Sequence, residues 1–261
     1  MKTICFTNNK GGVTKTVTAA TLAVILSRKK RVLFVDVDAQ ANGTTLFDAS
    51  LSNGTIYDAL NGRPCVPVPV RDRLDVVPAE AGLVAFDLEH AKDTQREQRL
   101  KSFLSQFRDK YDFCIIDTPP QTGALVVSAL VASDFAVIPT TPDAFAVAGL
   151  VRVLELLAQV RDRLSASVTL AGILLTQYDK RRVTMAAETM LRENFGKDVF
   201  STTIRSAAVV REAVTERKTV ADLKRSTSVL EDFERLASEI LRRTKCRNVH
   251  KTQFVFFRRA I

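Results

Sequence analysis

The sequence predicts an α/β fold: a doubly wound, mostly parallel sheet of about seven strands with helices on both faces. Along the 261 residues, short runs rich in β-branched and aromatic side chains alternate with longer helical stretches, a pattern typical of consecutive βαβ units. Three of the apolar runs lead into a glycine-containing turn or an acidic residue, at the edge where parallel sheets bind ligands. The strands are expected near residues 2–8, 31–36, 73–77, 112–117, 134–139, 168–176 and 199–203.

The first predicted strand and helix enclose a short basic loop. Residues 3–7 are β-rich, residues 17–26 are rich in Ala, Leu and Val, and the sequence KGGVTKT lies between them. A tight turn at a helix N-terminus points backbone N–H groups and the positive end of the helix dipole at one place, where polyphosphate binds. We expect Lys15 to reach the β- and γ-phosphates and the Thr16 hydroxyl to bind Mg²⁺.

The loop departs from the standard phosphate-binding pattern G-x-x-x-x-G-K-[ST] at two positions. Asn9 stands at the first glycine position and Thr14 at the second, while Gly11 and Gly12 lie within the loop. Taken alone, such a turn could serve only to reverse the chain. The residues that follow later in the chain favour phosphate binding.

Acidic residues end two further apolar runs. The run at 32–35 leads into Asp36, with Asp38 two residues later, and the run at 113–116 leads into Asp117. Buried parallel strands of this kind deliver their carboxylates to the same sheet edge as the loop. The alternative is that Asp36 and Asp117 only cap the segments that follow them. Together with the loop, the carboxylates predict a site for Mg²⁺ and a nucleotide.

The chain is expected to form one domain over residues 1–243 and a basic, aromatic tail over residues 244–261. Residues 41–72 are the least regular part, with short helices around residues 55–61. The four cysteines are scattered without a C-x-x-C pair, and Cys5 and Cys114 fall in predicted buried strands. Reduced thiols and a cytoplasmic protein are therefore expected. A strand that begins by residue 3 leaves no room for a signal peptide.

The net charge of +9, with a pI near 9.6, is high for a soluble enzyme. Such an excess favours a polyanionic partner, nucleic acid first and anionic membrane second, over a basic surface without a partner. The basic residues gather in two regions of the second half. They are Lys180, Arg181 and Arg182, followed by Arg205, Arg211, Arg217, Lys218, Lys224 and Arg225.

In this order, KGGVTKT, VDVDAQ and IIDTPP resemble the deviant Walker A, A′ and B motifs of the ParA/MinD superfamily of P-loop ATPases. The ParA branch, which partitions plasmids and chromosomes, is the closer match, and the resemblance covers about residues 1–243. Two positions depart from the family pattern. Thr14 replaces the glycine before the Walker lysine, and Ala39 replaces a proline. Both residues are small, so the resemblance implies retained nucleotide binding and leaves the hydrolysis rate open.

The resemblance implies a role for each residue of the site. Lys10 is the family's signature lysine, which in relatives reaches across a dimer interface to the partner's phosphates, as an arginine finger does. Asp38 is the candidate for positioning the attacking water, and Asp36 is expected to be structural. The implied catalytic residues are Lys10, Lys15 and Asp38; those implied to bind nucleotide are Lys10, Gly11, Gly12, Val13, Thr14, Lys15, Thr16 and Val17; those implied to bind magnesium are Thr16, Asp38 and Asp117.

The resemblance further implies a slow ATPase that uses ATP and Mg²⁺, dimerises with ATP and then binds DNA of any sequence on the nucleoid. A ParB-like centromere-binding protein would stimulate hydrolysis and so release the DNA. The implied DNA contacts are Lys180, Arg181, Arg182, Arg205 and Arg211, the last two as substitutes for a family arginine replaced near Val209. No membrane partner is expected.

Three alternatives stay open. A MinD-like membrane-associated positioning ATPase is supported by the tail, where Phe254, Phe256 and Phe257 lie beside Arg258 and Arg259; such a mixture could dock on lipid or nucleic acid. A small-molecule ligase or kinase on the same fold would not account for the basic charge. A protein that binds nucleotide but barely hydrolyses it would follow from the two family departures.

Overall fold

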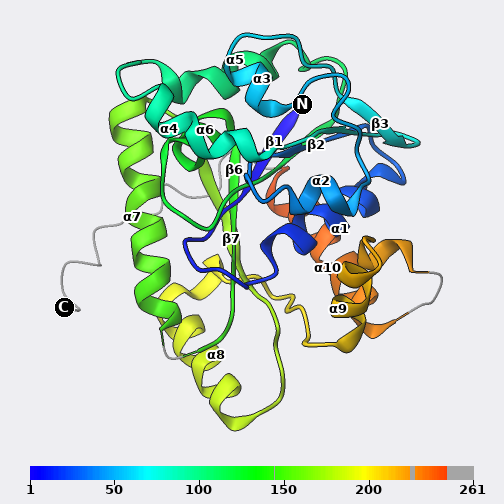
Figure 1. Ribbon diagram of the computed structural model, residues 1–261. Helices are drawn as coiled ribbons and strands as arrows, with labels where there is room; N and C mark the ends of the chain where they lie inside the picture. Colours follow the sequence, from blue (N-terminus) through cyan, green and yellow to red (C-terminus); the bar gives the residue numbers. More distant parts are fainter. Residues whose placement is uncertain (144, 224–226, 246–261) are drawn as a thin grey trace.

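The computed structural model describes residues 1–143, 145–223 and 227–245. Its centre is a seven-stranded sheet in the order β3-β4-β2-β5-β1-β6-β7 (Figure 1). The strands are β1 (Lys2–Phe6), β2 (Val32–Asp36), β3 (Val68–Arg71), β4 (Leu74–Val77), β5 (Phe113–Asp117), β6 (Phe135–Thr140) and β7 (Thr169–Leu175). In this sheet β3 pairs antiparallel with β4, and every other pairing is parallel. The predicted fold class is confirmed.

Helices cover both faces of the sheet (Figure 1). They are α1 (Lys15–Ser27), α2 (Asn42–Leu46), α3 (Ile56–Leu60), α4 (Phe86–Glu89), α5 (Arg99–Ser105), α6 (Ala124–Ala132), α7 (Ala146–Leu164), α8 (Arg182–Phe195), α9 (Ala208–Thr215) and α10 (Ser228–Arg243), with short 3₁₀ helices η1 (Ala81–Ala85), η2 (Arg96–Gln98), η3 (Gly196–Asp198) and η4 (Val220–Asp222). None of the helices in the described ranges is long and apolar enough to cross a membrane.

The central strands are buried on both faces, which explains their continuous apolar sequences. Every residue of β2 and of β5 is buried. Alternate side chains enter opposite layers: Phe34 and Ile115 pack with α1 and α10, whereas Val35 and Ile116 pack with α5 and α6. Cys5 and Cys114 lie in the second layer as buried free thiols, as the sequence predicts.

One predicted strand is wrong and one strand was missed. Residues 199–203 form only an isolated bridge, Val199 with Ile173, because the amides of Ser201 and Thr202 donate to the Glu239 carboxylate instead of to a neighbouring strand. The missed strand is β3, which has Pro69 at its centre. A proline cannot donate to a ladder and is tolerated at an edge, and β3 is the edge strand.

The short helix expected around residues 55–61 is confirmed as α3. Thr55 caps it through a capping box with Asp58: the Thr55 side chain accepts from the Asp58 amide, and the Asp58 carboxylate accepts from the Thr55 amide at 2.9 Å. The tail beyond residue 245, and with it the membrane alternative, lies outside the described residues, as do Lys224 and Arg225.

Candidate nucleotide-binding site

The basic loop of residues 7–14 joins β1 to α1 at the carboxyl edge of the sheet. Its last residue, Thr14, adopts the left-handed conformation at φ 55°, and Gly12 has φ 73°. A β-branched residue is rarely found there, so a family glycine has been replaced at a position that suits glycine. No side chain in the described structure caps the first turn of α1. Its free N–H groups and the helix dipole therefore face the loop, as anion binding requires.

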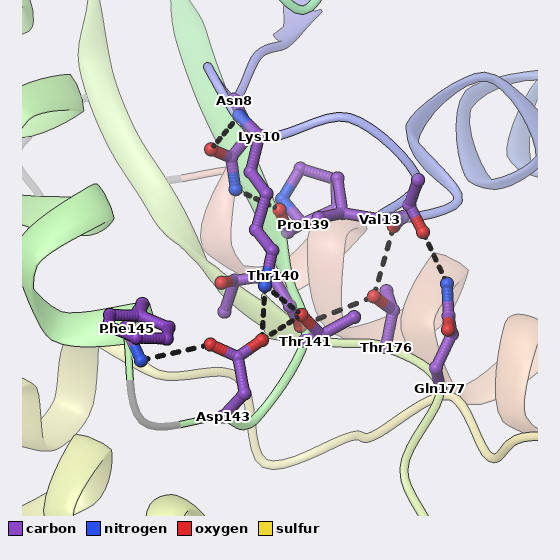
Figure 2. Close-up of polar contacts among 11 residues, drawn as sticks. Asn8, Lys10, Val13, Pro139, Thr140, Thr141, Asp143, Phe145, Thr176 and Gln177 are labelled. Carbon is purple, nitrogen blue, oxygen red and sulfur yellow. Dashed lines mark hydrogen bonds and ion pairs between the residues drawn. The ribbon is translucent and has the colours of Figure 1, made fainter.

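The front of the loop is fixed to the end of β6. The Asn8 amide nitrogen Nδ2 donates to the Pro139 carbonyl at 2.6 Å, and the Lys10 backbone N–H donates to Asn8 Oδ1 at 3.0 Å (Figure 2). Asn8 therefore ties the loop to a neighbouring strand and sets the direction of the chain at Lys10.

The back of the loop is fixed to the end of β7. The Thr176 hydroxyl donates to the Val13 carbonyl at 3.0 Å, and the Gln177 side chain donates to the Gly12 carbonyl (Figure 2). With the loop held from both sides, its N–H groups are oriented before any ligand arrives. Such preorganisation lowers the entropic cost of binding.

The loop and the segments after β2 and β5 line one cavity of about 590 Å³. The three predicted elements therefore converge. The sequence-predicted residues that line it are Gly11, Gly12, Val13, Thr14, Lys15, Thr16, Val17 and Asp38. The lining does not include Lys10 or Asp117 within the described chain, since Lys10 points toward the β6 end and Asp117 is fully buried beneath.

The carboxylates of the site are buried to similar degrees but bonded differently. Asp36 accepts hydrogen bonds from the Asp38 amide at 3.1 Å, and from the Thr44 amide and hydroxyl at 2.8 and 2.9 Å. Neither oxygen of Asp117 has a hydrogen-bond partner among the residues that the structure describes. Asp38 accepts from the Gln40 amide at 3.0 Å and faces the cavity.

Burial raises the pKa of both Asp36 and Asp117 above the ordinary carboxyl value. For Asp117 the positive charge of Lys15, which is only 7% exposed, and the nearby Thr16 hydroxyl oppose this rise in pKa, and the charge of Asp36 adds to it. For Asp36 the hydrogen bonds from Thr44 and Asp38 oppose the rise in pKa. An unpartnered buried carboxylate costs folding free energy unless a cation compensates it.

The donors fit a magnesium ion better than a cation held by protein alone. Within the described residues, no group of three or more His, Cys, Asp or Glu side chains could hold a metal. Mg²⁺ usually keeps several waters and takes only one or two carboxylates together with phosphate oxygens. Thr16 lines the cavity and Asp117 lies beneath it with both oxygens unpartnered, which is a donor set of this kind.

Lys10 is held by an ion pair that no sequence motif indicates. Its Nζ donates to the Asp143 carboxylate and, at 3.0 Å, to the Thr141 hydroxyl (Figure 2). Asp143 follows β6, whereas Lys10 follows β1. No local pattern links them, but the adjacency of β1 and β6 in the sheet brings their ends together.

Another wall of the cavity was also missed. Leu83 and Asp87, from η1 and α4, line it. The Asp87 carboxylate accepts from the Ala124 amide at 3.1 and 3.2 Å, and so caps the start of α6. Gly123 permits this approach, because a Cβ there would lie 2.6 Å from Asp87 Oδ2. Helices this short leave no periodic pattern in the sequence.

A second cavity, of about 170 Å³, opens on the other side of Thr14. Its lining combines the apolar side chains of Ile204, Val210 and Phe233 with Gln177, Arg205 and Arg211. Arg205 is bound to the buried Asp232 carboxylate by two hydrogen bonds, at 2.6 and 2.8 Å. The structure thus places two of the predicted DNA contacts beside the loop.

The two basic regions lie side by side. Tyr178, which precedes Lys180, forms a parallel bridge with Arg205. The Arg181 side chain is 81% exposed and pairs with Asp179, and Lys180, Arg182 and Arg211 are exposed. Their DNA contacts stay predictions.

Residues 1–170 match the protein family described as "AAA domain". Over 251 residues the chain is 32% identical to the chromosome-partitioning ATPase Soj of Treponema pallidum, covering 93% of this chain and 98% of that protein. Apo McdA from Cyanothece, at 22% identity, shares the fold with a TM-score of 0.84 over 92% of this chain and 99% of that chain. A plasmid partition protein from Borrelia burgdorferi bound to AMPPNP is 26% identical, with a TM-score of 0.78 over 94% and 98% of the two chains.

Proposed function

The chain belongs to the ParA/Soj family of partitioning ATPases, and on this premise we propose that it segregates DNA by a cycle of ATP binding and hydrolysis. The observation that carries the proposal is the convergence of the basic loop, Asp38 and the segment after β5 on one cavity. Arg205 and Arg211 line the second cavity, which has Thr14 in common with the first, and the 180–182 region adjoins Arg205 through the bridge at Tyr178. Nucleotide and DNA would therefore bind close to one another.

The phosphates of ATP would lie along residues 11–16, where free N–H groups at the start of α1 and the Lys15 ammonium supply positive charge. Mg²⁺ would be held by Thr16 and, directly or through water, by Asp117; when bound it neutralises phosphate charge that develops during transfer. The unpartnered oxygens of Asp117 support this assignment. The base would enter the second cavity beside Thr14, whose apolar lining suits an aromatic ring.

Asp38 is proposed to orient the attacking water. It is 6% exposed, its Oδ1 is fixed by the Gln40 amide, and it faces the cavity. Phosphoryl transfer relies on positioning and electrostatics. Lys15 is the one lysine or arginine among the described residues that line the cavity, so an orienting carboxylate acting with that single cation would give slow turnover.

Lys10 is proposed to complete the site of a second subunit. It stands apart from the cavity of its own chain, and its side chain is 43% exposed. An ammonium delivered from the partner would add charge where the γ-phosphate becomes more negative. ATP would therefore promote a two-fold dimer, and a ParB-like protein at the centromere would stimulate hydrolysis and dimer dissociation.

The decisive experiment compares retention of non-specific duplex DNA with ATP, ADP and no nucleotide. We expect retention with ATP only, and none for Lys15→Ala under any condition. A steep dependence on salt should accompany binding, because several phosphates would be neutralised. Equal retention in the three conditions would contradict the proposal.

A pair of matched variants tests the surface itself. Arg181→Ala with Arg182→Ala should weaken binding to all sequences and lower the salt slope by about 2. Arg161→Ala with Arg163→Ala, which removes the same charge from the end of α7, should leave the slope unchanged. Equal effects of the two pairs would indicate attraction by net charge rather than by this surface.

A further inference from the structure

The side chain of Lys10 is bound at a specific place in its own subunit. Its Nζ contacts two groups on the segment after β6: the Asp143 carboxylate and the Thr141 hydroxyl (Figure 2). Its backbone N–H is fixed by Asn8. The side chain is therefore directed along the β6 end, beside the cavity rather than into it.

Asp143 is itself held in place before Lys10 reaches it. Its Oδ1 accepts from the Phe145 backbone N–H at 3.0 Å, and its Oδ2 accepts from the Thr141 hydroxyl at 2.6 Å (Figure 2). Burial alone would raise the pKa of the Asp143 carboxyl, but these hydrogen bonds and that from Lys10 hold the pKa below its ordinary value. Asp143 is thus a fixed anion at neutral pH.

We infer that Asp143 is a positioning residue that retains Lys10 in its own subunit until the nucleotide phosphates of a second subunit compete for the ammonium. The inference rests on the proposed function, in which Lys10 acts across a dimer. Asp143 would then set how much ATP-loaded protein is needed before the two sites complete each other.

The pair has the properties of an exchangeable contact. The side chains of Lys10 and Asp143 are 43% and 34% exposed, so water and salt screen their attraction, and an exposed ion pair is weak. A triphosphate carries more negative charge than one carboxylate and can take the ammonium from it. Two-fold symmetry doubles the cost that this ion pair adds to dimerisation, because both Lys10–Asp143 pairs must open when one dimer forms.

The test is dimerisation of the full chain with a non-hydrolysable ATP analogue and Mg²⁺, followed by sedimentation velocity. Asp143→Asn keeps an acceptor for the Phe145 amide and removes the charge. It should lower the dimer dissociation constant roughly two- to thirtyfold, the range expected when two exposed ion pairs no longer compete. Glu234→Gln, which removes the exposed pair with Arg28 at 2.7 Å, should leave that constant unchanged.

Two further measurements separate this role from a structural one. In a Lys10→Gln background, Asp143→Asn should bring no gain in dimerisation. In the nucleotide-free monomer, Asp143→Asn should speed acylation of the Lys10 amine, followed by mass spectrometry, because the carboxylate no longer holds the amine against the segment after β6.

The outcomes distinguish the inference from the function beneath it. If Lys10→Gln dimerises like the natural chain, the cross-dimer role of Lys10 fails. If Lys10→Gln is impaired while Asp143→Asn leaves dimerisation unchanged or weaker, or if the gain persists without Lys10, only the role of Asp143 is overturned.

Discussion

Two neighbouring strand ends, Asp36 on β2 and Asp117 on β5, share a position but differ in bonding. They are partners in the register of the parallel pair, and both are completely buried. Asp36 accepts three hydrogen bonds from its own chain, and the oxygens of Asp117 accept none from the described residues. One carboxylate builds the site, whereas the other is available to a ligand.

The residues that follow each strand explain the difference. An aspartate readily accepts a hydrogen bond from the amide two residues later. Two residues after Asp36 stands Asp38, whose amide makes that bond; two residues after Asp117 stands Pro119, and Pro120 follows. Proline has no N–H to donate. The chain therefore satisfies Asp36 locally and leaves Asp117 without a local donor.

Burial alone therefore does not mark a ligand-binding carboxylate. A buried carboxylate that accepts hydrogen bonds from its own chain stabilises the fold, whereas one that accepts none is available to bind a cation. Thr44 connects Asp36 to a further part of the chain. Its hydroxyl donates to Asp36 and accepts from the Ala79 amide at 2.8 Å. Gly43 allows the close approach, as a Cβ there would lie 2.7 Å from Phe34.

Removing the charge of Asp117 should produce the largest functional effect. Asp117→Asn should lower Mg²⁺-dependent ATP hydrolysis by about a hundredfold or more, because the carboxylate that holds or orients the cation is lost. The free energy of unfolding without nucleotide should stay the same or rise. Steady-state phosphate release and urea denaturation measure the two, with the exposed Asp72→Asn as control. A large loss of stability in Asp117→Asn would show that Asp117 stabilises the fold, as Asp36 does.

Removing Asp36 should have the opposite profile. Asp36→Ala leaves the Asp38 amide and both Thr44 donors without their acceptor, and should lower the free energy of unfolding by about 3 kcal/mol. Urea denaturation without nucleotide or Mg²⁺ measures this change, and Asp117→Asn serves as the matched control. A change below about 0.5 kcal/mol would show that the three bonds at Asp36 do not stabilise the fold.

Much of this could be predicted from the sequence, because it depends on local patterns. The apolar runs of β2 and β5 predicted buried parallel strands, and parallel strands must bring Asp36 and Asp117 to one edge. The pairing of Lys10 with Asp143 could not be predicted, since the two residues are 133 positions apart in sequence and meet only because β1 and β6 lie adjacent in the sheet. The strand predicted at 199–203 failed for a similar reason: Glu239, far along the chain, takes its amide donors.

Thr14 lies between these two cases. Its replacement of a family glycine was visible in the sequence, but its left-handed backbone was not. Thr14→Gly should keep this backbone conformation and remove its steric cost, because glycine adopts positive φ readily. A change in the hydrolysis rate of that variant would show that this strain affects turnover.

Removing the Thr44 hydroxyl should have a smaller effect on stability and tests how Asp36 stabilises the fold. Thr44→Val keeps the shape of the side chain but removes the hydroxyl that links Asp36 to Ala79. The free energy of unfolding should fall by about 2 kcal/mol, while ATP hydrolysis at saturating Mg²⁺ stays near that of the natural chain. Thr45→Val is the control, since the exposed Thr45 hydroxyl donates only to the Ala41 carbonyl in the described contacts. Equal losses of unfolding free energy in the two variants would show that the Thr44 hydroxyl does not stabilise the fold through Asp36.

The smallest effect concerns pH. Burial raises the folded-state pKa of Asp117, so between the ordinary carboxyl value of about 3.9 and that raised value the folded chain binds more protons than the unfolded chain. Asp117 therefore costs no stability below the ordinary value, and the free energy of unfolding falls as pH rises through the window.

Asp117→Asn lacks this loss of stability. Its advantage over the natural chain should grow by about 1 kcal/mol between pH 6 and pH 7 in urea denaturation without Mg²⁺. Mg²⁺ with an ATP analogue should reduce the advantage, because the cation then compensates the charge that the chain leaves unpartnered; an advantage that is constant with pH would mean that Asp117 finds a partner in the folded state after all.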